Sequence, residues 1–316
     1  MLSVWPPARL PAQDVPLNAG ALFLVFPMGG QAVGMGQAAV ATEGRGEAAF
    51  WNPAGLATLE TNEFSLHSAN LFAGRTTAVA AYLPSHGIGV VGGSVYLADY
   101  GDEDVTVDST GAVGHLAARN LEFLASYATV LGGSAVFGLS YKLVQFRVDC
   151  TGDCRNVPSG QGTTHALDLG GQFRVGSGPL RVGVALRNVG FKLQVHNQAQ
   201  ADPLPARLAV GALYQVLCAA PAGAPGERLD MKLAADVDSP WGGAGQSQMR
   251  FGVDVGYQRL VRLRAGYALV QDGFSGASVG LGVENGSIGV DLARTFVTGS
   301  DLQADNPTFF SFRVTF

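Results

Sequence analysis

The eight residues at the carboxyl end of the chain alternate between apolar and polar side chains and stop on an aromatic. They read Phe309-Phe310-Ser311-Phe312-Arg313-Val314-Thr315-Phe316. Successive side chains of a β-strand point to opposite faces of a sheet. From Phe310 onward, one face would therefore be wholly apolar and the other polar. This is the pattern of a strand that has hydrocarbon on one side and water on the other.

The composition fits a protein whose outer surface faces lipid. Charged residues make up 14% of the chain, against about 25% in typical soluble domains. Glycine accounts for 44 of 316 residues, which suits closely packed walls and tight turns. No apolar run approaches the roughly 18 residues of a membrane helix. Hydrophobicity is thus distributed as in a β-barrel, and a net charge of -5 without a basic cluster argues against nucleic acid as a partner.

From residue 61 onward the sequence reads as a succession of strands. Most are close to the roughly 9 to 11 residues that cross a bilayer at a tilt. We predict about fourteen strands, at residues 63–70, 75–83, 87–98, 119–130, 133–148, 163–175, 180–188, 206–217, 228–237, 249–258, 260–271, 275–284, 286–296 and 307–316. The predicted fold is all-β, a transmembrane antiparallel barrel formed by residues 61–316 and surrounded by outer-membrane lipid.

Several of these strands show which side chains face the lumen. In residues 249–258, for example, Phe251 and Val253 alternate with Arg250 and Asp254. An Arg or Lys on the lipid face at mid-depth would cost about 2 to 4 kcal/mol. We therefore expect the apolar set to face lipid and the charged set to face the lumen.

A β-sandwich is the main alternative architecture, and the lengths of the connections argue against it. Short connections such as 84–86 and 285–286 alternate with longer ones such as 99–118 and 149–162. Outer-membrane barrels pair short periplasmic turns with longer external loops. We therefore expect the carboxyl terminus and the amino-terminal segment on the periplasmic side of the bacterial outer membrane.

The segment before the first strand contains a glycine-rich stretch, with Gly34 and Gly36, and the element Asn52-Pro53-Ala54-Gly55. Glycine lets the backbone approach a neighbour closely, and proline fixes φ while holding the preceding residue extended. Asn52 can also cap a turn through its side chain. We interpret these residues as structural anchors of the segment, with direct ligand contact as the alternative.

The same segment resembles the PorV/PorQ family, which belongs with the FadL-type outer-membrane channels. The resemblance rests on residues 20–41 and on residues 48–57, which read Ala-Ala-Phe-Trp-Asn-Pro-Ala-Gly-Leu-Ala. It implies that residues 17–60 fold into the barrel lumen as a hatch. The terminal pattern of Phe312, Val314 and Phe316 likewise resembles the signal that the barrel-assembly machinery recognises.

Cys150 and Cys154 bracket three residues of a predicted external loop. We expect a small disulfide, which suits an oxidising compartment, because a metal site would need further ligands nearby. We predict neither a metal nor a cofactor.

Residues 1–16 look like the end of a signal peptide whose beginning is missing. They lack a basic start and a continuous apolar core. A start codon upstream of Met1 would explain this pattern.

No constellation of residues points to catalysis. The acidic residues Asp102, Glu103 and Asp104 fall in one predicted loop and read as a solvated face. None of the histidines sits in a motif with a nucleophile and an orienting acid. They are His67, His86, His115, His165 and His196. We therefore expect a protein that is not an enzyme.

Two functions follow from the resemblance. PorV/PorQ proteins imply an accessory role in type IX protein secretion or envelope assembly, with a translocon and its cargo as partners. FadL-like proteins imply a transporter for long-chain fatty acids or other hydrophobic molecules. The predicted loops 99–118 and 189–205 are mainly polar, which favours the first function because hydrophobic uptake requires an apolar external pocket. The sequence assigns no ligand-binding residue; Val105, Val107, Val113, Leu116, Phe191 and Leu193 are candidates for a small groove.

Overall fold

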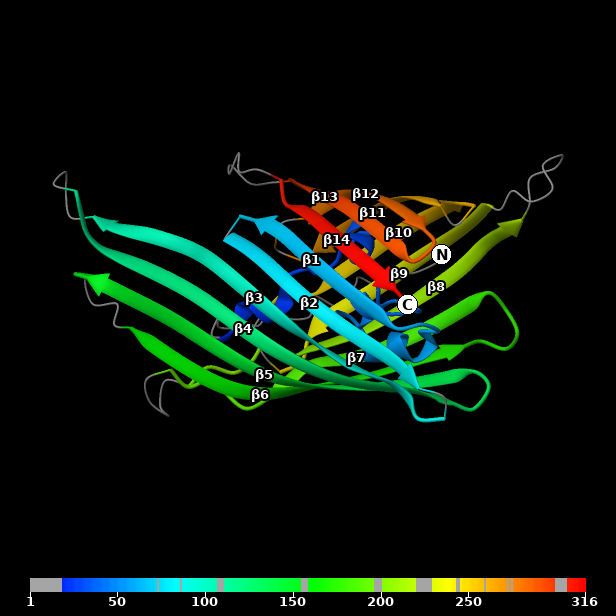
Figure 1. The fold of residues 1–316 in the computed structure, drawn as a ribbon, viewed down its shortest axis with the longest axis horizontal. Helices are drawn as coiled ribbons and strands as arrows, with labels where there is room; N and C mark the ends of the chain where they lie inside the picture. The colour runs from blue at the N-terminus through cyan, green and yellow to red at the C-terminus, as the bar shows by residue number, and fades with distance from the viewer. Residues whose placement is uncertain are drawn as a thin grey trace, which may run out of the picture.

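The computed structural model describes residues 19–72, 74–85, 87–106, 111–154, 159–195, 201–219, 229–242, 245–258, 260–271, 273, 275–298 and 306–316. Over these residues the chain forms a closed antiparallel barrel of fourteen strands (Figure 1). The strands are β1(Glu63–Leu71), β2(Gly74–Ser85), β3(Gly89–Thr106), β4(Ala112–Leu131), β5(Ala135–Gly152), β6(Gly160–Arg174), β7(Leu180–Gly190), β8(Arg207–Ala219), β9(Leu229–Pro240), β10(Gln248–Tyr257), β11(Val261–Val270), β12(Ser275–Asn285), β13(Ile288–Thr298) and β14(Thr308–Thr315). The predicted fold class is confirmed, and the segment 1–16 lies outside the described residues.

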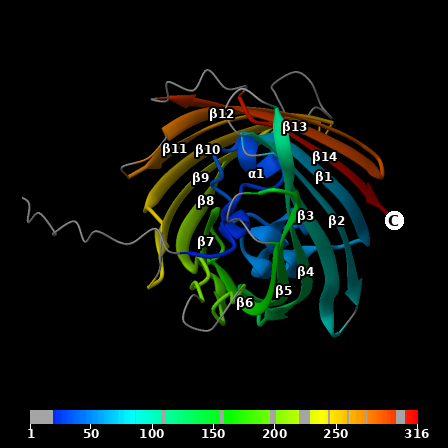
Figure 2. The ribbon, with the colours of Figure 1, turned by 90° about the vertical axis from the view of Figure 1, so that its left-hand side faces the viewer.

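Each strand pairs with its neighbours in sequence, and the first strand closes the ring by pairing with the last. In the β1–β14 ladder, Glu63 lies opposite Thr315 and Asn70 lies opposite Thr308. A closed sheet leaves no edge with unpaired N–H and C=O groups, which a sheet in hydrocarbon requires. The view along the barrel shows this ring (Figure 2).

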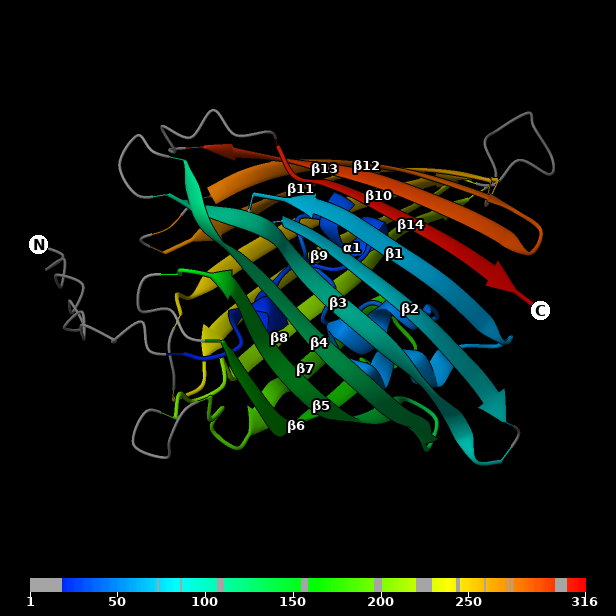
Figure 3. The same ribbon diagram turned by 60° about the vertical axis from the view of Figure 1, so that its left-hand side comes forward.

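The barrel has two different ends. At the turn end, β1 begins and β14 terminates, and only Gly286 and Ser287 separate β12 from β13. At the loop end, β3 and β4 extend far beyond β1, because they contain 18 and 20 residues against 9. Figure 3 shows the carboxyl terminus at the end opposite to this extension.

The loop predicted at 99–118 is wrong over most of its length. β3 continues to Thr106 and β4 already begins at Ala112, so Asp102, Glu103 and Asp104 lie in a strand rather than a loop. The β3–β4 ladder contains register shifts between Asp99 and Asp102 and between Val105 and Thr106. Such irregularities interrupt the alternation of side chains that marks a strand. The loop predicted at 149–162 is also shorter than expected, because strands continue into it from both sides. β5 runs to Gly152 and β6 starts at Gly160.

The two faces of the wall carry the side chains that the alternation predicts. Phe251 and Leu263 are 46% and 60% exposed on the outside. Asp254 and Arg264, which occupy the intervening positions, are buried on the lumen side and form an ion pair at 2.9 Å. The apolar outer band therefore faces lipid, while charged groups pair inside where they avoid hydrocarbon.

The lumen is filled by the segment that precedes β1, which we call the hatch (residues 19–62). It contains three short 3₁₀ helices and one α-helix: η1(Leu22–Val25), α1(Gly30–Gly34), η2(Gly46–Phe50) and η3(Pro53–Thr58). Figure 2 shows these elements inside the ring of strands. Gly20 donates its N–H to the carbonyl of Pro203 beyond β7, at the loop end. The hatch thus crosses the lumen from the loop end to the start of β1 at the turn end. Among the described residues, no helix is long and apolar enough to span a membrane.

Candidate functional site

Glycines seat the first half of the hatch directly on the wall. Gly36 has φ 64°, and a Cβ at this position would lie 2.5 Å from the Tyr267 nitrogen and 2.6 Å from the Phe251 oxygen. A Cβ on Gly34 would lie 3.0 Å from the Cα of Gly280. The Gly36 N–H donates to the Ser278 hydroxyl at 3.0 Å. No larger residue fits Gly36, so this stretch of hatch backbone is held against β10, β11 and β12.

The Asn-Pro-Ala-Gly element forms a buried turn against the opposite wall. The Asn52 side-chain oxygen accepts the Ala54 N–H at 3.1 Å, while its amide donates to the Val40 carbonyl at 2.7 Å. The same amide lies 3.3 Å from the carbonyl oxygens of Gly171 and Val184 on β6 and β7. Pro53 occupies the first position of η3, where a missing N–H has no cost. These hydrogen bonds join the hatch to β6 and β7, and the anchoring role of the element stays a prediction.

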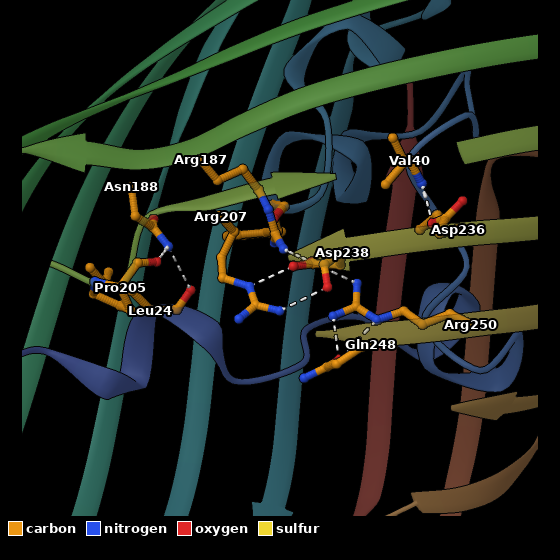
Figure 4. A network of polar contacts seen from close by, with 12 residues as sticks. Leu24, Val40, Arg187, Asn188, Pro205, Arg207, Asp236, Asp238, Gln248 and Arg250 are labelled. Atoms are coloured by element: carbon orange, nitrogen blue, oxygen red, sulfur yellow. Dashed lines mark hydrogen bonds and ion pairs between the residues drawn. The ribbon is translucent and has the colours of Figure 1, made fainter. Parts of the chain in front are cut away.

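Asp236 of β9 holds the middle of the hatch. Its carboxylate accepts the N–H groups of Ala39 at 2.7 Å and Val40 at 2.9 Å. Both donors are in irregular backbone, so they have no helix or strand partner that could replace the carboxylate. Figure 4 shows this contact beside the charged network described next.

Three arginines converge on Asp238, two residues further along β9 (Figure 4). Arg187 and Arg207 lie 2.7 and 2.5 Å from its carboxylate oxygens, and Arg250 lies 3.1 Å away. All four side chains are buried. The ring of Trp51 in the hatch contacts two of the guanidinium groups, with its centroid 5.5 Å from the Arg187 Cζ and 5.4 Å from the Arg250 Cζ. These cation–π contacts join the network to the hatch.

A second buried network lies between β4, β5 and β6. Lys142 approaches Asp168 at 2.9 Å and Glu122 at 3.8 Å, and it donates to the Asn188 side-chain oxygen at 2.7 Å. Asp168 also accepts the Asn188 N–H at 2.7 Å, next to a register shift in the β6–β7 ladder between Leu167 and Leu169. The carboxylate thus replaces a ladder bond that the shift removes.

Glu47 is buried within the hatch and faces the beginning of α1. Its carboxyl accepts the Ala32 N–H at 2.6 Å. Burial, followed by the proximity of Asp291, raises the pKa of Glu47 to about 8. The group is therefore largely protonated at neutral pH, since its pKa lies above 7.

An apolar pocket of about 320 Å³ opens at the loop end, between the hatch and the wall. Hatch residues Val25, Phe26 and Pro27 form one side. The other side consists mainly of lumen-facing positions of β1 and β10 to β14: Leu71, Gln248, Ala268, Val270, Gly276, Thr295, Val297 and Phe309. Charged residues, which dominate the lumen elsewhere, do not line this pocket among the described residues. It can accept a small apolar molecule from outside the barrel.

A polar cavity of about 480 Å³ lies at the turn end. Arg181 and Glu43 form an ion pair in its wall, and Arg45 pairs with Glu284 of β12 at 2.7 Å nearby. The hatch and the two charged networks separate this cavity from the apolar pocket. The two cavities thus lie at opposite ends of the hatch.

The predicted disulfide, the terminal aromatic pattern and one candidate groove residue lie in different parts of the barrel. Cys150 and Cys154 form a disulfide at the end of β5. Phe312 and Val314 face outward on β14, and Phe316 is 69% exposed at the turn end; their role as an assembly signal stays a prediction. Leu193 is buried against Gly20 rather than exposed in a groove.

The described residues contain no group of three or more His, Cys, Asp or Glu side chains that could hold a metal ion. His67 is buried, with its ring nitrogens 2.8 Å from the Ser311 hydroxyl and 3.2 Å from that of Ser65. Ser311 in turn accepts the Gly30 N–H at 2.8 Å. These bonds seat α1 on the wall. His86 and His196 lie outside the described residues.

Sequence reasoning missed Trp51, Arg187, Arg207 and the residues of the apolar pocket. The one signal for the pocket was Phe309, an aromatic on the face of β14 that otherwise carries Ser311 and Arg313. An apolar residue among polar lumen-facing residues marks the place where the lining of the lumen changes from polar to apolar.

No protein-family model matches the sequence, and no curated protein matches it. Solved structures with the same fold include the Ralstonia pickettii toluene transporter TbuX, with 14% identity, coverage of 95% of this chain and 99% of that one, and a TM-score of 0.61. The monoaromatic hydrocarbon channel CymD is 13% identical over 92% of this chain and 97% of its own, with a TM-score of 0.61. A Pseudomonas aeruginosa FadL homologue is 12% identical over 92% and 98%, with a TM-score of 0.58. The chain thus shares, over nearly its whole length, the FadL-like barrel fold of these proteins, and membership of the PorV/PorQ family is not shown.

Proposed function

We propose that this protein is a non-enzymatic outer-membrane channel that admits small hydrophobic molecules from outside the cell. The observation that carries the proposal is the apolar pocket at the loop end, which lies between Val25 to Pro27 of the hatch and the inner faces of β10 to β14. A pocket for hydrophobic uptake has to be concave, mostly apolar and open to the side from which the ligand arrives. The fold that the chain shares with a toluene transporter and a monoaromatic hydrocarbon channel supports the same function.

The volume of the pocket supports a small ligand. Its 320 Å³ is near the lower end of the roughly 300 to 1,000 Å³ of small-molecule sites. A dry cavity of about 150 Å³ already binds benzene. A molecule with one aromatic ring, or an aliphatic one of similar size, therefore fits the pocket.

In this proposal the loop end faces outward and the carboxyl terminus faces the periplasm. The short connections at the turn end, such as Gly286 and Ser287, support this orientation. In this proposal passage inward requires the hatch to shift, which would disturb its contacts with Asp236 and with Arg187 beside Asp238. Hydrophobic uptake ranks above an accessory role in protein export, since the pocket and the structural likeness both favour it.

The test compares two charge substitutions at matched positions. Val270→Asp places a carboxylate in the apolar pocket at the end of β11, whereas Gln215→Asp places one in the polar cavity near the end of β8. Both positions are half-buried. An apolar ligand that enters the pocket would displace water from this carboxylate and offer no hydrogen bond in return. We expect this desolvation to cost more than about 1.4 kcal/mol, which is a tenfold loss of affinity.

The measurement is the initial rate of radiolabelled toluene entry into cells that display equal amounts of folded barrel, together with toluene binding by the purified protein. We expect Val270→Asp to lose both activities and Gln215→Asp to keep them. Equal activity in the two variants, or no toluene entry above that of cells without the protein, would overturn the proposal.

A further inference from the structure

The polar cavity at the turn end carries an imbalance of charge. Five of its lining residues are cationic, namely Arg45, Arg174, Arg181, Lys232 and Arg262. Two are acidic, namely Glu43 and Asp254. The cavity encloses about 480 Å³ and lies beside the hatch, so it has room for a small solute as well as water.

Ion pairs account for three of the five cations. Arg181 pairs with Glu43, and Arg45 pairs with Glu284 at 2.7 Å. Arg262 lies between two carboxylates, 2.7 Å from Asp230 and 2.8 Å from Asp254. Each of these guanidinium groups therefore has an acidic partner within the protein.

Lys232 and Arg174 have no acidic partner within 4 Å among the described residues. Lys232 lies on β9 between Gln215 of β8 and Asp254 of β10 in the ladder, but Asp254 is engaged by Arg262 and Arg264. Arg174 lies directly opposite Arg181 in the β6–β7 ladder. Like charges opposite each other in a sheet destabilise it, so an anion in the cavity would relieve a repulsion that the wall itself contains.

We propose that this cavity is a binding site for an anionic group, a carboxylate or a phosphate, of a small molecule at the periplasmic mouth. Lys232 on β9 is the main ligand, and Arg181 on β7 and Arg174 on β6 complete the cationic lining on one side of it. Gln31 and Gln215, which also line the cavity, supply neutral polar groups. The anion could be free, or it could be the head group of an amphipathic molecule with an apolar tail.

The site has a direct link to the hatch. Glu43 is a hatch residue that already pairs with Arg181, and an anion bound beside Arg181 competes with this carboxylate. Binding would therefore weaken one of the ion pairs that hold the hatch at the turn end. The anion site does not depend on hydrophobic uptake, which concerns a pocket at the other end of the barrel.

The experiment uses the small number of lysines in the chain. Only Lys142, Lys192 and Lys232 occur in the sequence. Reductive methylation with ¹³C-formaldehyde labels lysines and keeps their positive charge. The full-length protein in a neutral detergent is titrated with inorganic phosphate, with octanoate and with octanol, while the methyl resonances are followed by NMR. Lys192, exposed near the loop end, is the internal reference.

We expect the Lys232 methyl resonance to shift saturably with at least one anion, and its shift to be at least about fivefold larger than that of Lys192. Added salt should return the resonance to its original position, because salt screens the charge. A response to phosphate supports a site for free anions. A response to octanoate that octanol does not produce supports a site for an anionic head group. An equal response to octanol, an equal shift of Lys192, or no saturable shift with either anion would overturn the proposal.

A pair of variants tests the same site without the label. Lys232→Met removes the charge of the main ligand, and Lys192→Met removes a charge at the far end. Calorimetric titration with the anion that shifts Lys232 should show about a tenfold loss of affinity for Lys232→Met, or about 1.4 kcal/mol. Lys192→Met should bind like the unmodified chain. Toluene binding, measured in parallel, should be unaffected by Lys232→Met, which separates this proposal from the proposed uptake function.

Discussion

The Asp236 carboxylate accepts the backbone N–H of Val40 at 2.9 Å across a separation of 196 residues in sequence. The same oxygen accepts the Ala39 N–H. One wall residue thus satisfies two successive donors of the hatch, both of them buried. The hatch is held by polar contacts with individual wall residues as well as by packing.

Removal of this acceptor should loosen the hatch. In Asp236→Ala the N–H groups of Ala39 and Val40 lose their partner, and each buried unsatisfied group costs about 1 to 3 kcal/mol. We expect a higher single-channel conductance in planar bilayers and faster entry of small hydrophilic solutes. Asp236→Asn keeps a side-chain oxygen at this position and should leak less. A closed channel in Asp236→Ala would show that packing alone retains the hatch.

Gly36 offers a second test, because its backbone lies directly against the wall at β10 and β11, next to β9. In Gly36→Ala the new Cβ would lie 2.5 Å from the Tyr267 nitrogen, so the hatch has to move away from β10 and β11. Gly286→Ala is the matched control, since its φ of 58° resembles the 64° of Gly36 but nothing lies within 4 Å of its Cβ. Left-handed strain alone costs about 1 to 2 kcal/mol.

We therefore expect Gly36→Ala to increase hydrogen exchange of the amides in α1, with little change in Gly286→Ala. Exchange measured by mass spectrometry on both variants isolates the steric effect from the backbone strain. Identical exchange in the two variants would mean that the hatch accommodates a side chain at this position.

The three arginines around Asp238 predict that barrel stability depends on this carboxylate. In Asp238→Asn three buried guanidinium groups lose their shared counter-charge, and breaking a buried ion pair costs about 3 to 5 kcal/mol. Asp230→Asn is the control, because Arg262 retains Asp254 at 2.8 Å. The temperature at which the folded barrel loses its faster electrophoretic mobility should fall much more for Asp238→Asn. Equal shifts would contradict a special role for the cluster.

The strands could be predicted because each strand has lipid on one side and the lumen on the other. In β10 and β14 the alternation of residues follows directly from this asymmetry. It fails in β3 and β4 near the loop end, where register shifts after Asp99 and Val105 move side chains to the other face. A local pattern cannot show that such a stretch still pairs with its neighbour.

The site was harder to predict because its residues are brought together by closure of the ring. Arg187, Arg207 and Arg250 lie on three different strands, and each looks like an ordinary lumen charge until Asp238 is placed among them. The apolar pocket also combines hatch and wall. Among the described residues of the predicted loops 99–118 and 189–205, which seemed too polar for hydrophobic uptake, none lines this pocket. The resemblance to PorV/PorQ favoured a role in protein export, whereas the pocket favours the uptake of hydrophobic molecules.

Glu47 predicts a dependence of the hatch on pH. Its pKa is raised from 4.5 to about 8, so the folded hatch binds a proton that an unfolded hatch releases above about pH 4.5. A group whose pKa is higher in the folded state loses its stabilising effect as pH rises. The hatch should therefore lose stability between about pH 4.5 and 8, and change little beyond that range.

Glu47→Gln has no proton to lose and should remove this dependence. The measurement is hydrogen exchange of residues 30–36 at several pH values, taken as the ratio of the unmodified chain to Glu47→Gln so that the intrinsic effect of pH cancels. A ratio that rises with pH up to about 8 agrees with the assignment, and a constant ratio would show that Glu47 does not control the seating of α1.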